Sequence, residues 1–280
     1  MRASFADLLA EAGARRAAVG AFTCYNLETA VGVLRAAERR GRGVVLLLGE
    51  QSFRAAGGEL LAVALVSVAG RAAAPACVQL DHVSDLSLIE AAFECGIGAV
   101  MADGSRLPLE ENVELVRAAG ALARRAGGHV EVELGAIEGD EDVARAVAAG
   151  ALTEPDEAAG FVERSGADCL AVSIGNVHGV YTEPPALDWL RLGAIRERVD
   201  VPLSLHGASG LSDADLRRAI SLGVAKVNVN TELRERYLEV TSRLLDEVRP
   251  GARVLELNLA QAGAVGEVVE AKLDTYEGRS

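Results

Sequence analysis

Long apolar runs are missing from this sequence of 280 residues, although 50% of its residues are apolar and 25% are charged. That balance is ordinary for a globular protein and excludes a disordered chain. The longest apolar stretch, around Leu60 to Gly70, is far shorter than the ~20 residues that a membrane span needs. Residues 1–16 have charges scattered through an amphipathic helical pattern, so we expect no secretory signal and no membrane partner.

Positive charge is also scarce. The chain has 28 lysine and arginine residues against 41 aspartate and glutamate residues, which gives a formal net charge of −13. Nucleic acids and anionic membranes bind basic surfaces, so neither is expected as a partner. An anionic substrate would be repelled by the protein as a whole, and its site would need local positive potential from a metal ion or from backbone dipoles.

Closely spaced cysteine pairs are absent as well. The four cysteines (Cys24, Cys77, Cys95 and Cys169) lie in or beside apolar segments, and no two of them have CxxC spacing. This pattern predicts reduced thiols in a cytoplasmic protein and does not favour a zinc–thiolate site.

Short β-rich runs alternate with helical patterns along the whole chain, which predicts βαβ units and a parallel sheet. Eight such units at this length favour an α/β fold of the (β/α)8 TIM-barrel type over an open sheet. We expect one domain over residues 1–280, with extra C-terminal helices that follow Thr231 and join near Pro250. The predicted strands are Val19–Cys24, Val44–Gly49, Ala76–His82, Ala99–Gly104, His129–Gly135, Cys169–Gly175, Pro202–Gly207 and Ala225–Asn230.

Three of the four histidines occupy equivalent places in this barrel. His82 ends the third predicted strand, His178 lies just past the sixth, and His206 ends the seventh. Active sites of TIM barrels are built at the carboxyl ends of the strands. Three imidazoles around an open position form a catalytic type of zinc site, although other divalent ions such as cobalt also bind imidazole. We therefore predict a metal site at these three histidines.

Asp81 directly precedes His82. Neighbours in a strand point to opposite faces, but the pleat relaxes at a strand end, so both side chains can reach the mouth of the barrel. A carboxylate beside a metal-bound substrate is a natural proton donor and acceptor. The alternative is that Asp81 orients one of the histidines.

Two segments that follow the seventh and eighth predicted strands favour phosphate binding. They are Gly207-Ala208-Ser209-Gly210 and Asn228-Val229-Asn230-Thr231. Barrels often bind phosphate at these two loops, through backbone N–H groups and a helix N-terminus. Taken alone, Ser209 could be a turn residue and Thr231 a helix N-cap; beside three histidines, phosphate binding is the preferred interpretation.

Seven segments occur in an order and spacing that is specific to one enzyme family. They are GAFTCYNLETA (Gly20–Ala30), LDH (Leu80–His82), MADGSRLPLEENV (Met101–Val113), VEVELGAIEGDED (Val130–Asp142), IGNVHGVY (Ile174–Tyr181), LHGASGL (Leu205–Leu211) and KVNVNTELR (Lys226–Arg234). With these segments the chain resembles the class II, metal-dependent ketose-bisphosphate aldolases, and most closely their tagatose- and fructose-bisphosphate branch.

The resemblance implies an aldolase that cleaves a ketose 1,6-bisphosphate reversibly into dihydroxyacetone phosphate and an aldehyde such as glyceraldehyde 3-phosphate. It implies that Asp81 is the catalytic proton donor and that the three histidines hold one zinc ion per subunit. Glu141 matches the acidic residue that acts as base on the ketose fragment, with an exposed loop charge as the alternative; Glu133 and Asp103 match acidic positions around the metal. The implied dihydroxyacetone phosphate ligands are Gly179, Gly207, Ala208, Ser209, Asn228, Val229, Asn230 and Thr231.

Some positions depart from the family pattern. Relatives often have histidine where this chain has Gln79 and Arg106, and glycine where it has Val83, and the segment Gly49–Ser52 lacks the usual small residues. None of these positions is a predicted metal ligand. They leave open the identity of the aldehyde partner, and with it the choice between fructose and tagatose bisphosphate.

Several alternatives stay open at this point. The chain could act on another phosphorylated sugar, such as a deoxy-keto-gluconate phosphate, could be a zinc hydrolase, or could be a non-catalytic subunit that needs a companion. A lysine Schiff-base aldolase is not expected, because Lys226 opens the eighth predicted strand below the rim and Lys272 lies in the C-terminal tail. The family resemblance implies a cytoplasmic homodimer or homotetramer and leaves the need for a monovalent cation open.

Overall fold

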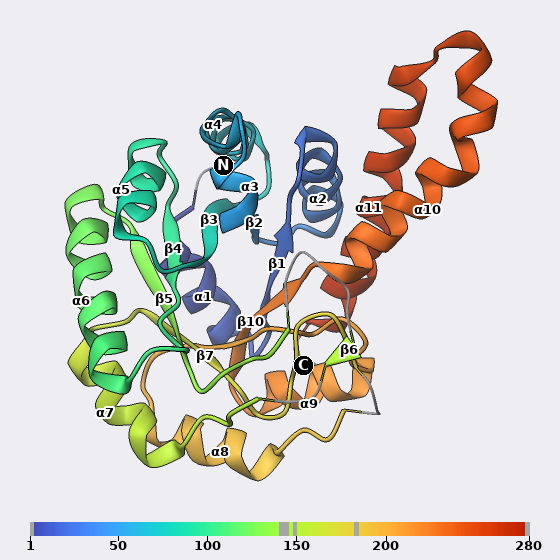
Figure 1. The fold of residues 1–280 in the computed structure, drawn as a ribbon. Helices are drawn as coiled ribbons and strands as arrows, with labels where there is room; N and C mark the ends of the chain where they lie inside the picture. Colours follow the sequence, from blue (N-terminus) through green and yellow to red (C-terminus); the bar gives the residue numbers. More distant parts are fainter. Residues whose placement is uncertain (1–2, 140–145, 148–149, 182–184, 278–280) are drawn as a thin grey trace.

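Eight parallel strands close into a barrel in the computed structural model, which describes residues 3–139, 146–147, 150–181 and 185–277 (Figure 1). Their order around the barrel is β1-β10-β9-β7-β5-β4-β3-β2. Each of the eight predicted runs overlaps one of these strands, so the predicted TIM barrel is confirmed. The strands are β1 (Val19–Thr23), β2 (Val44–Gly49), β3 (Ala76–Val83), β4 (Ala99–Ala102), β5 (His129–Leu134), β7 (Cys169–Val172), β9 (Leu203–Leu205) and β10 (Val224–Val229).

Helices cover the outside of the barrel and follow most of its strands (Figure 1). Many of these helices begin and end at residues that cap the free backbone groups of a helix terminus. Asn26, for example, accepts the backbone N–H of Thr29 at the start of α2, and Gly41 ends that helix with a φ of 61°. The helices are α1 (Phe5–Ala14), α2 (Leu27–Arg40), α3 (Glu50–Arg54), α4 (Gly58–Arg71), α5 (Leu86–Glu94), α6 (Leu109–Ala126), α7 (Pro155–Ser165), α8 (Trp189–Arg198), α9 (Asp213–Ser221), α10 (Thr231–Val248) and α11 (Val254–Thr275).

The last two helices form a hairpin that extends away from the barrel (orange and red in Figure 1). A short 3-10 turn at Arg249–Gly251 joins them, where the sequence predicts a junction near Pro250. Helix α11 returns to pack on α2, and the Arg40–Asp274 ion pair (2.8 Å) ties the two together. None of the described helices combines the length and the apolar character that a bilayer crossing requires.

The connection after β5 contains the short strand β6 (Ala146–Val147), which pairs in parallel with β8 (Val180–Tyr181) of the connection after β7. A hydrogen bond from the His178 backbone N–H to the Glu138 carbonyl oxygen (2.7 Å) links the same two connections. The connection after β5 thus holds the segment that carries His178 at two points.

Helix α1 closes the end of the barrel where the strands begin. Its residues Phe5, Leu8 and Leu9 are buried among apolar side chains of several barrel strands, including Leu47 and Cys77. Burial of these side chains removes apolar surface from water and stabilises this end of the barrel.

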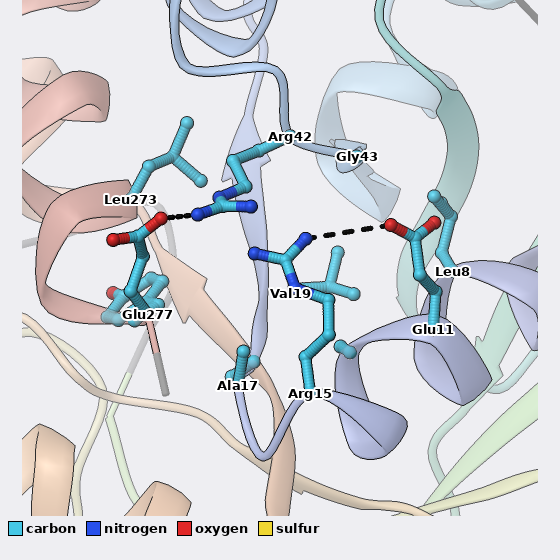
Figure 2. Close-up of a pocket in the computed structure, with 12 residues that line it drawn as sticks. Leu8, Glu11, Arg15, Ala17, Val19, Arg42, Gly43, Leu273 and Glu277 are labelled. Carbon is cyan, nitrogen blue, oxygen red and sulfur yellow. Dashed lines mark ion pairs between the residues drawn. The ribbon is translucent and has the colours of Figure 1, made fainter. Parts of the chain in front are cut away.

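A small pocket lies beside α1 at this closed end. Figure 2 shows Arg15 and Arg42 next to each other in the pocket, each paired with a carboxylate, Glu11 and Glu277 respectively. The Arg15–Glu11 pair is long, at 3.6 Å, and its side chains are partly exposed, so it contributes little to stability. No predicted functional residue lines this pocket.

Candidate active site

The three predicted histidines meet at the opposite end of the barrel. His82 comes from the end of β3, His178 from the connection after β7, and His206 from the residue after β9. Their ring centroids are 4.8 Å (82–178), 4.9 Å (82–206) and 5.8 Å (178–206) apart. One ring nitrogen from each histidine lies within 4.8 Å of the others. This spacing suits three imidazole ligands of one metal ion.

A local irregularity lets Asp81 and His82 face the same cavity although they are neighbours in a strand. The pairing of β3 with β4 shifts register between Leu80 and Val83, which leaves one extra residue in β3. His82 takes a φ of 48°, a left-handed conformation that is rare for residues other than glycine. Both side chains line a cavity of about 210 Å³ together with His178. The sequence-based idea of a relaxed strand end is thus replaced by a bulge inside the strand.

Carboxylates hold the outer nitrogens of two of the histidines. Asp103 Oδ2 lies 2.7 Å from His82 Nδ1, and Glu131 Oε1 lies 2.8 Å from His206 Nε2. Such partners are typical of metal-binding histidines, because they fix the tautomer and the orientation of the ring.

The charges around the cluster favour a cation. Burial lowers the pKa of His82, but the carboxylates of Asp81 and Asp103 outweigh it and leave the pKa of His82 well above its usual value. Burial lowers the pKa of His206, which favours its neutral, metal-binding form. The site therefore attracts positive charge at its centre, which a metal ion would supply.

Asp81 has one oxygen that is held and one that is buried without a partner. Its Oδ2 accepts a hydrogen bond from Asn228 Nδ2 (3.2 Å), whereas Oδ1 has no hydrogen-bond partner among the described residues. Buried polar atoms are rarely left unpaired. An unpaired carboxylate oxygen beside three imidazoles fits a site made for a metal ion and a polar ligand.

A second group of donors shares His82. Asp103 and Glu133 form it, and their oxygens lie within 4.8 Å of a His82 nitrogen. Burial, and then the charge of Asp103, raise the pKa of Glu133 to about 7. Its Oε1 accepts the Ile137 backbone N–H (2.9 Å), while Oε2 is buried without a partner in the described structure. Glu133 is thus placed to serve as an alternative ligand.

The predicted phosphate segments follow β9 and span the end of β10, beside this cluster. Gly207 has a φ of 62°, and a Cβ atom there would lie 2.0 Å from the Val177 carbonyl oxygen, so only glycine fits. Gly179, with a φ of 98°, also needs glycine. The side chains of Ala208 and Val229 are buried in the hydrophobic core, so these two residues offer only their backbone to a ligand.

The other predicted phosphate ligands surround the start of α10. Asn230, not Thr231, is the N-cap, so the N-cap alternative for Thr231 is wrong; Asn230 makes no side-chain capping bond. The first N–H groups of α10 can therefore serve an anion. Ser209 is buried in the loop that follows β9. Glu141, the predicted loop base, lies outside the described residues.

A comparison with protein families shows which family the chain belongs to. The model of the family "Fructose-bisphosphate aldolase class-II" matches residues 3–278. The chain belongs to this family. It is therefore an aldolase-type lyase.

Individual relatives agree with this assignment. The chain is 44% identical over 232 residues to the D-tagatose-1,6-bisphosphate aldolase subunit GatY of Klebsiella oxytoca, covering 82% of this chain and 81% of GatY. It is 41% identical over 216 residues to protein YdjI of Escherichia coli K12, covering 77% and 78% of the two chains. The crystal structure of the YdjI aldolase superimposes with a TM-score of 0.88 at 35% identity and covers 99% of this chain and 97% of YdjI.

Two residues of this aldolase-family chain were not recognised as site residues from the sequence. Glu131 contacts His206, and Lys226 contacts Glu131 (2.8 Å) in a pair whose side chains are fully buried. Both lie in strands that are buried almost throughout, HVEVEL and VAKVNV. A charged residue in the middle of such a strand must find a buried partner, and this signal could have identified the pair.

Two positions that depart from the family pattern have visible roles. Gln79 donates from Nε2 to Glu131 Oε2 (2.7 Å), so it supports the same buried carboxylate. Arg106 lies at the cavity mouth, highly exposed, and pairs with Glu138 at 3.4 Å. The lysine Schiff-base alternative loses its best candidate, because the Lys226 ammonium lies in the buried ion pair with Glu131.

Proposed function

We propose that this chain is a zinc-dependent aldolase that cleaves fructose or tagatose 1,6-bisphosphate into dihydroxyacetone phosphate and glyceraldehyde 3-phosphate. One observation carries the proposal: three imidazoles converge beside the free oxygen of Asp81 in a chain of the class-II family. The name of the GatY relative supports a ketose bisphosphate as the substrate class.

In this proposal His82, His178 and His206 hold one zinc ion per subunit. Their nitrogen donors, their spacing and the carboxylates behind two of them fit a divalent cation. When bound, zinc supplies a Lewis acid that stabilises negative charge on the ketose fragment. Asp103 and Glu133 lie beside His82, where their carboxylates keep the local potential negative. The proposal assigns no residue to a monovalent cation.

Asp81 moves the proton that carbon–carbon cleavage requires. In the cleavage direction its Oδ1 takes the proton of the C4 hydroxyl, the C3–C4 bond breaks, and the electron pair stays on C3 while C4 becomes the aldehyde carbon. Asn228 holds Oδ2 meanwhile, so the carboxylate cannot turn away. The same oxygen returns the proton during condensation.

The phosphate of the ketose fragment is proposed to bind between the two loops after β9 and β10. Gly179, Gly207, Ala208 and Ser209 would contribute from one side, and residues 228–231 from the other. Backbone N–H groups at the start of α10 supply the positive potential that an acidic protein otherwise lacks. Binding energy from this non-reacting group orients the sugar for cleavage.

The remaining parts of the proposal rest on the sequence and on the family resemblance. Glu141 would protonate C3 of the ketose fragment after cleavage. Residues 1–280 would form one catalytic domain. The protein would act in the cytoplasm as a homodimer or homotetramer, as part of sugar-phosphate breakdown such as glycolysis.

A retro-aldol assay over a panel of ketose phosphates tests the proposal. We expect triose phosphate from fructose or tagatose bisphosphate, loss of turnover in EDTA, and recovery on addition of zinc. Triose phosphate from a deoxy-keto-gluconate phosphate alone would assign another sugar, and release of inorganic phosphate would instead indicate a zinc hydrolase. Full turnover in metal-free protein, or no cleavage of any ketose phosphate by the zinc-loaded protein, would refute the proposal. GatY is named as a subunit, so the assay includes the purified chain alone.

A further inference from the structure

A buried ion pair lies in the barrel directly below the histidine cluster. Lys226 Nζ is 2.8 Å from Glu131 Oε2, and both side chains are completely shielded from solvent. Moving two charges out of water is costly, and a buried pair is often no more stabilising than an apolar replacement of the same shape. Stability alone therefore gives no clear reason for this pair, and its other contacts point to a different role.

The first of these contacts fixes the ring of His206. Glu131 binds Lys226 through Oε2 and His206 Nε2 through Oε1 (2.8 Å). An ionised carboxylate only accepts hydrogen bonds, so His206 must carry its proton on Nε2. Its Nδ1 then offers a lone pair toward the cluster, where it lies 3.0 Å from His82 Nε2.

The second contact fixes the amide of Asn228. Lys226 Nζ donates to Asn228 Oδ1 (2.6 Å), and an ammonium cannot accept, so the oxygen of this amide must face the lysine. The amide nitrogen is thereby turned toward Asp81 Oδ2 (3.2 Å) and His206 Nδ1 (3.2 Å). One ammonium group thus sets the direction of two hydrogen-bond chains.

We propose that Lys226 is a positioning residue, which orients the metal ligand His206 through Glu131 and the proton-transfer residue Asp81 through Asn228. Gln79 completes the arrangement by donating a second hydrogen bond to Glu131 Oε2 (2.7 Å). The inference rests on the proposed metal role of His206. It adds a role for a lysine that makes no contact with the substrate cavity.

The test compares zinc affinity in Lys226→Met, Glu131→Gln and the double variant, measured by competition with a chromophoric chelator. Each change keeps the approximate size of the side chain, and the double variant leaves no unpaired buried charge. The amide introduced by Glu131→Gln can present either its oxygen or its nitrogen to His206, so the ring is no longer held in one tautomer. We expect zinc affinity to fall about 10- to 100-fold in all three, as for other partners of metal-binding histidines. The two single effects should be strongly non-additive, because they break one chain.

A matched control uses the other lysine. Lys272→Met also breaks a lysine–carboxylate pair, with Glu232 at 2.8 Å, but outside this network. It should leave zinc affinity unchanged. The absorption spectrum of the cobalt-substituted protein adds a second measurement, since a reoriented His206 alters the ligand field in Lys226→Met and not in the control.

Two results would overturn the inference. One is a folded double variant that binds zinc as tightly as the wild type. The other needs no variant: nitrogen-15 NMR of the metal-free wild type must find the proton of His206 on Nε2, and a proton on Nδ1 contradicts the argument. A wild type that binds no zinc would instead refute the proposed function, so the two failures are distinguishable.

Discussion

Replacement of Asp81 by asparagine separates its proposed role in proton transfer from any role in structure. Asp81 Oδ2 accepts a hydrogen bond from Asn228 (3.2 Å), and an asparagine side chain can present its oxygen to the same donor. The amide nitrogen then occupies the place of Oδ1, where it cannot take a proton. The variant should therefore fold, keep its metal, and lose only the proton acceptor.

The size of the effect follows from this geometry. A positioned general acid or base contributes about 10²- to 10⁴-fold to a rate. Because no packing contact is lost, we expect a fall in kcat of about 10³-fold, which corresponds to about 4 kcal/mol of activation free energy. The assay is retro-aldol turnover with zinc content measured on the same samples.

The neighbouring carboxylate Asp85 provides the control. It caps α5 through the backbone N–H of Ser87 (2.9 Å), and asparagine caps a helix equally well. Asp85→Asn should thus retain full turnover. If Asp81→Asn turned over within a few-fold of the wild type while holding zinc, Asp81 would not be the proton-transfer group.

Further predictions address the metal, the phosphate loop and a distant ion pair. His206→Ala should lose zinc, determined by metal analysis, whereas Asp81→Ala should keep it; equal zinc content in the two would contradict the assigned ligands. Gly207→Ala places a Cβ atom 2.0 Å from the Val177 carbonyl oxygen at a φ of 62°, so it should lower the free energy of unfolding by about 2–5 kcal/mol and raise KM. The control Gly193→Ala adds a Cβ atom in α8 that meets nothing within 4 Å, so it should be neutral or stabilising by up to about 1 kcal/mol. Equal denaturation midpoints of the two variants would refute the steric argument. The ion pair with Asp168 (3.5 Å) raises the pKa of His129 in the folded protein, so its stabilising effect is complete below the unfolded-state pKa and is lost as pH rises through the folded-state pKa. His129→Gln should accordingly reduce the free energy of unfolding more at about pH 5.5 than at about pH 9, on either side of the usual histidine range, and a pH-independent difference would exclude this role.

The barrel could be predicted because its signals are local. Runs such as VVLLLG between helical patterns indicate strands by composition, and closure follows from eight βαβ units of this length. The ends of the strands were less predictable. For example, β7 ends at Val172, three residues before the predicted end, because Asn176 Oδ1 accepts the Ile174 N–H (2.8 Å) and turns the chain.

The histidine cluster could be predicted for the same reason, since the ends of parallel strands meet at one rim. The bulge at Asp81 and the φ of His82 could not, because they depend on the pairing of β3 with β4. The pairing of Lys226 with Glu131 joins residues 95 positions apart, on strands that are not adjacent in the barrel. Periodicity tells which residues face inward but does not tell which of them meet across the interior.

The plug that α1 forms has a consequence for metal exchange. Phe5, Leu8 and Leu9 fill the lower end of the barrel, so we expect a bound ion to leave through the cavity lined by His82 and His178 at the opposite end. A metal ion that leaves the site would then pass through the same cavity that the sugar substrate is proposed to occupy. Saturating sugar phosphate should therefore delay the stripping of zinc by a chelator, and an equal rate of stripping with and without sugar would reveal a second exit.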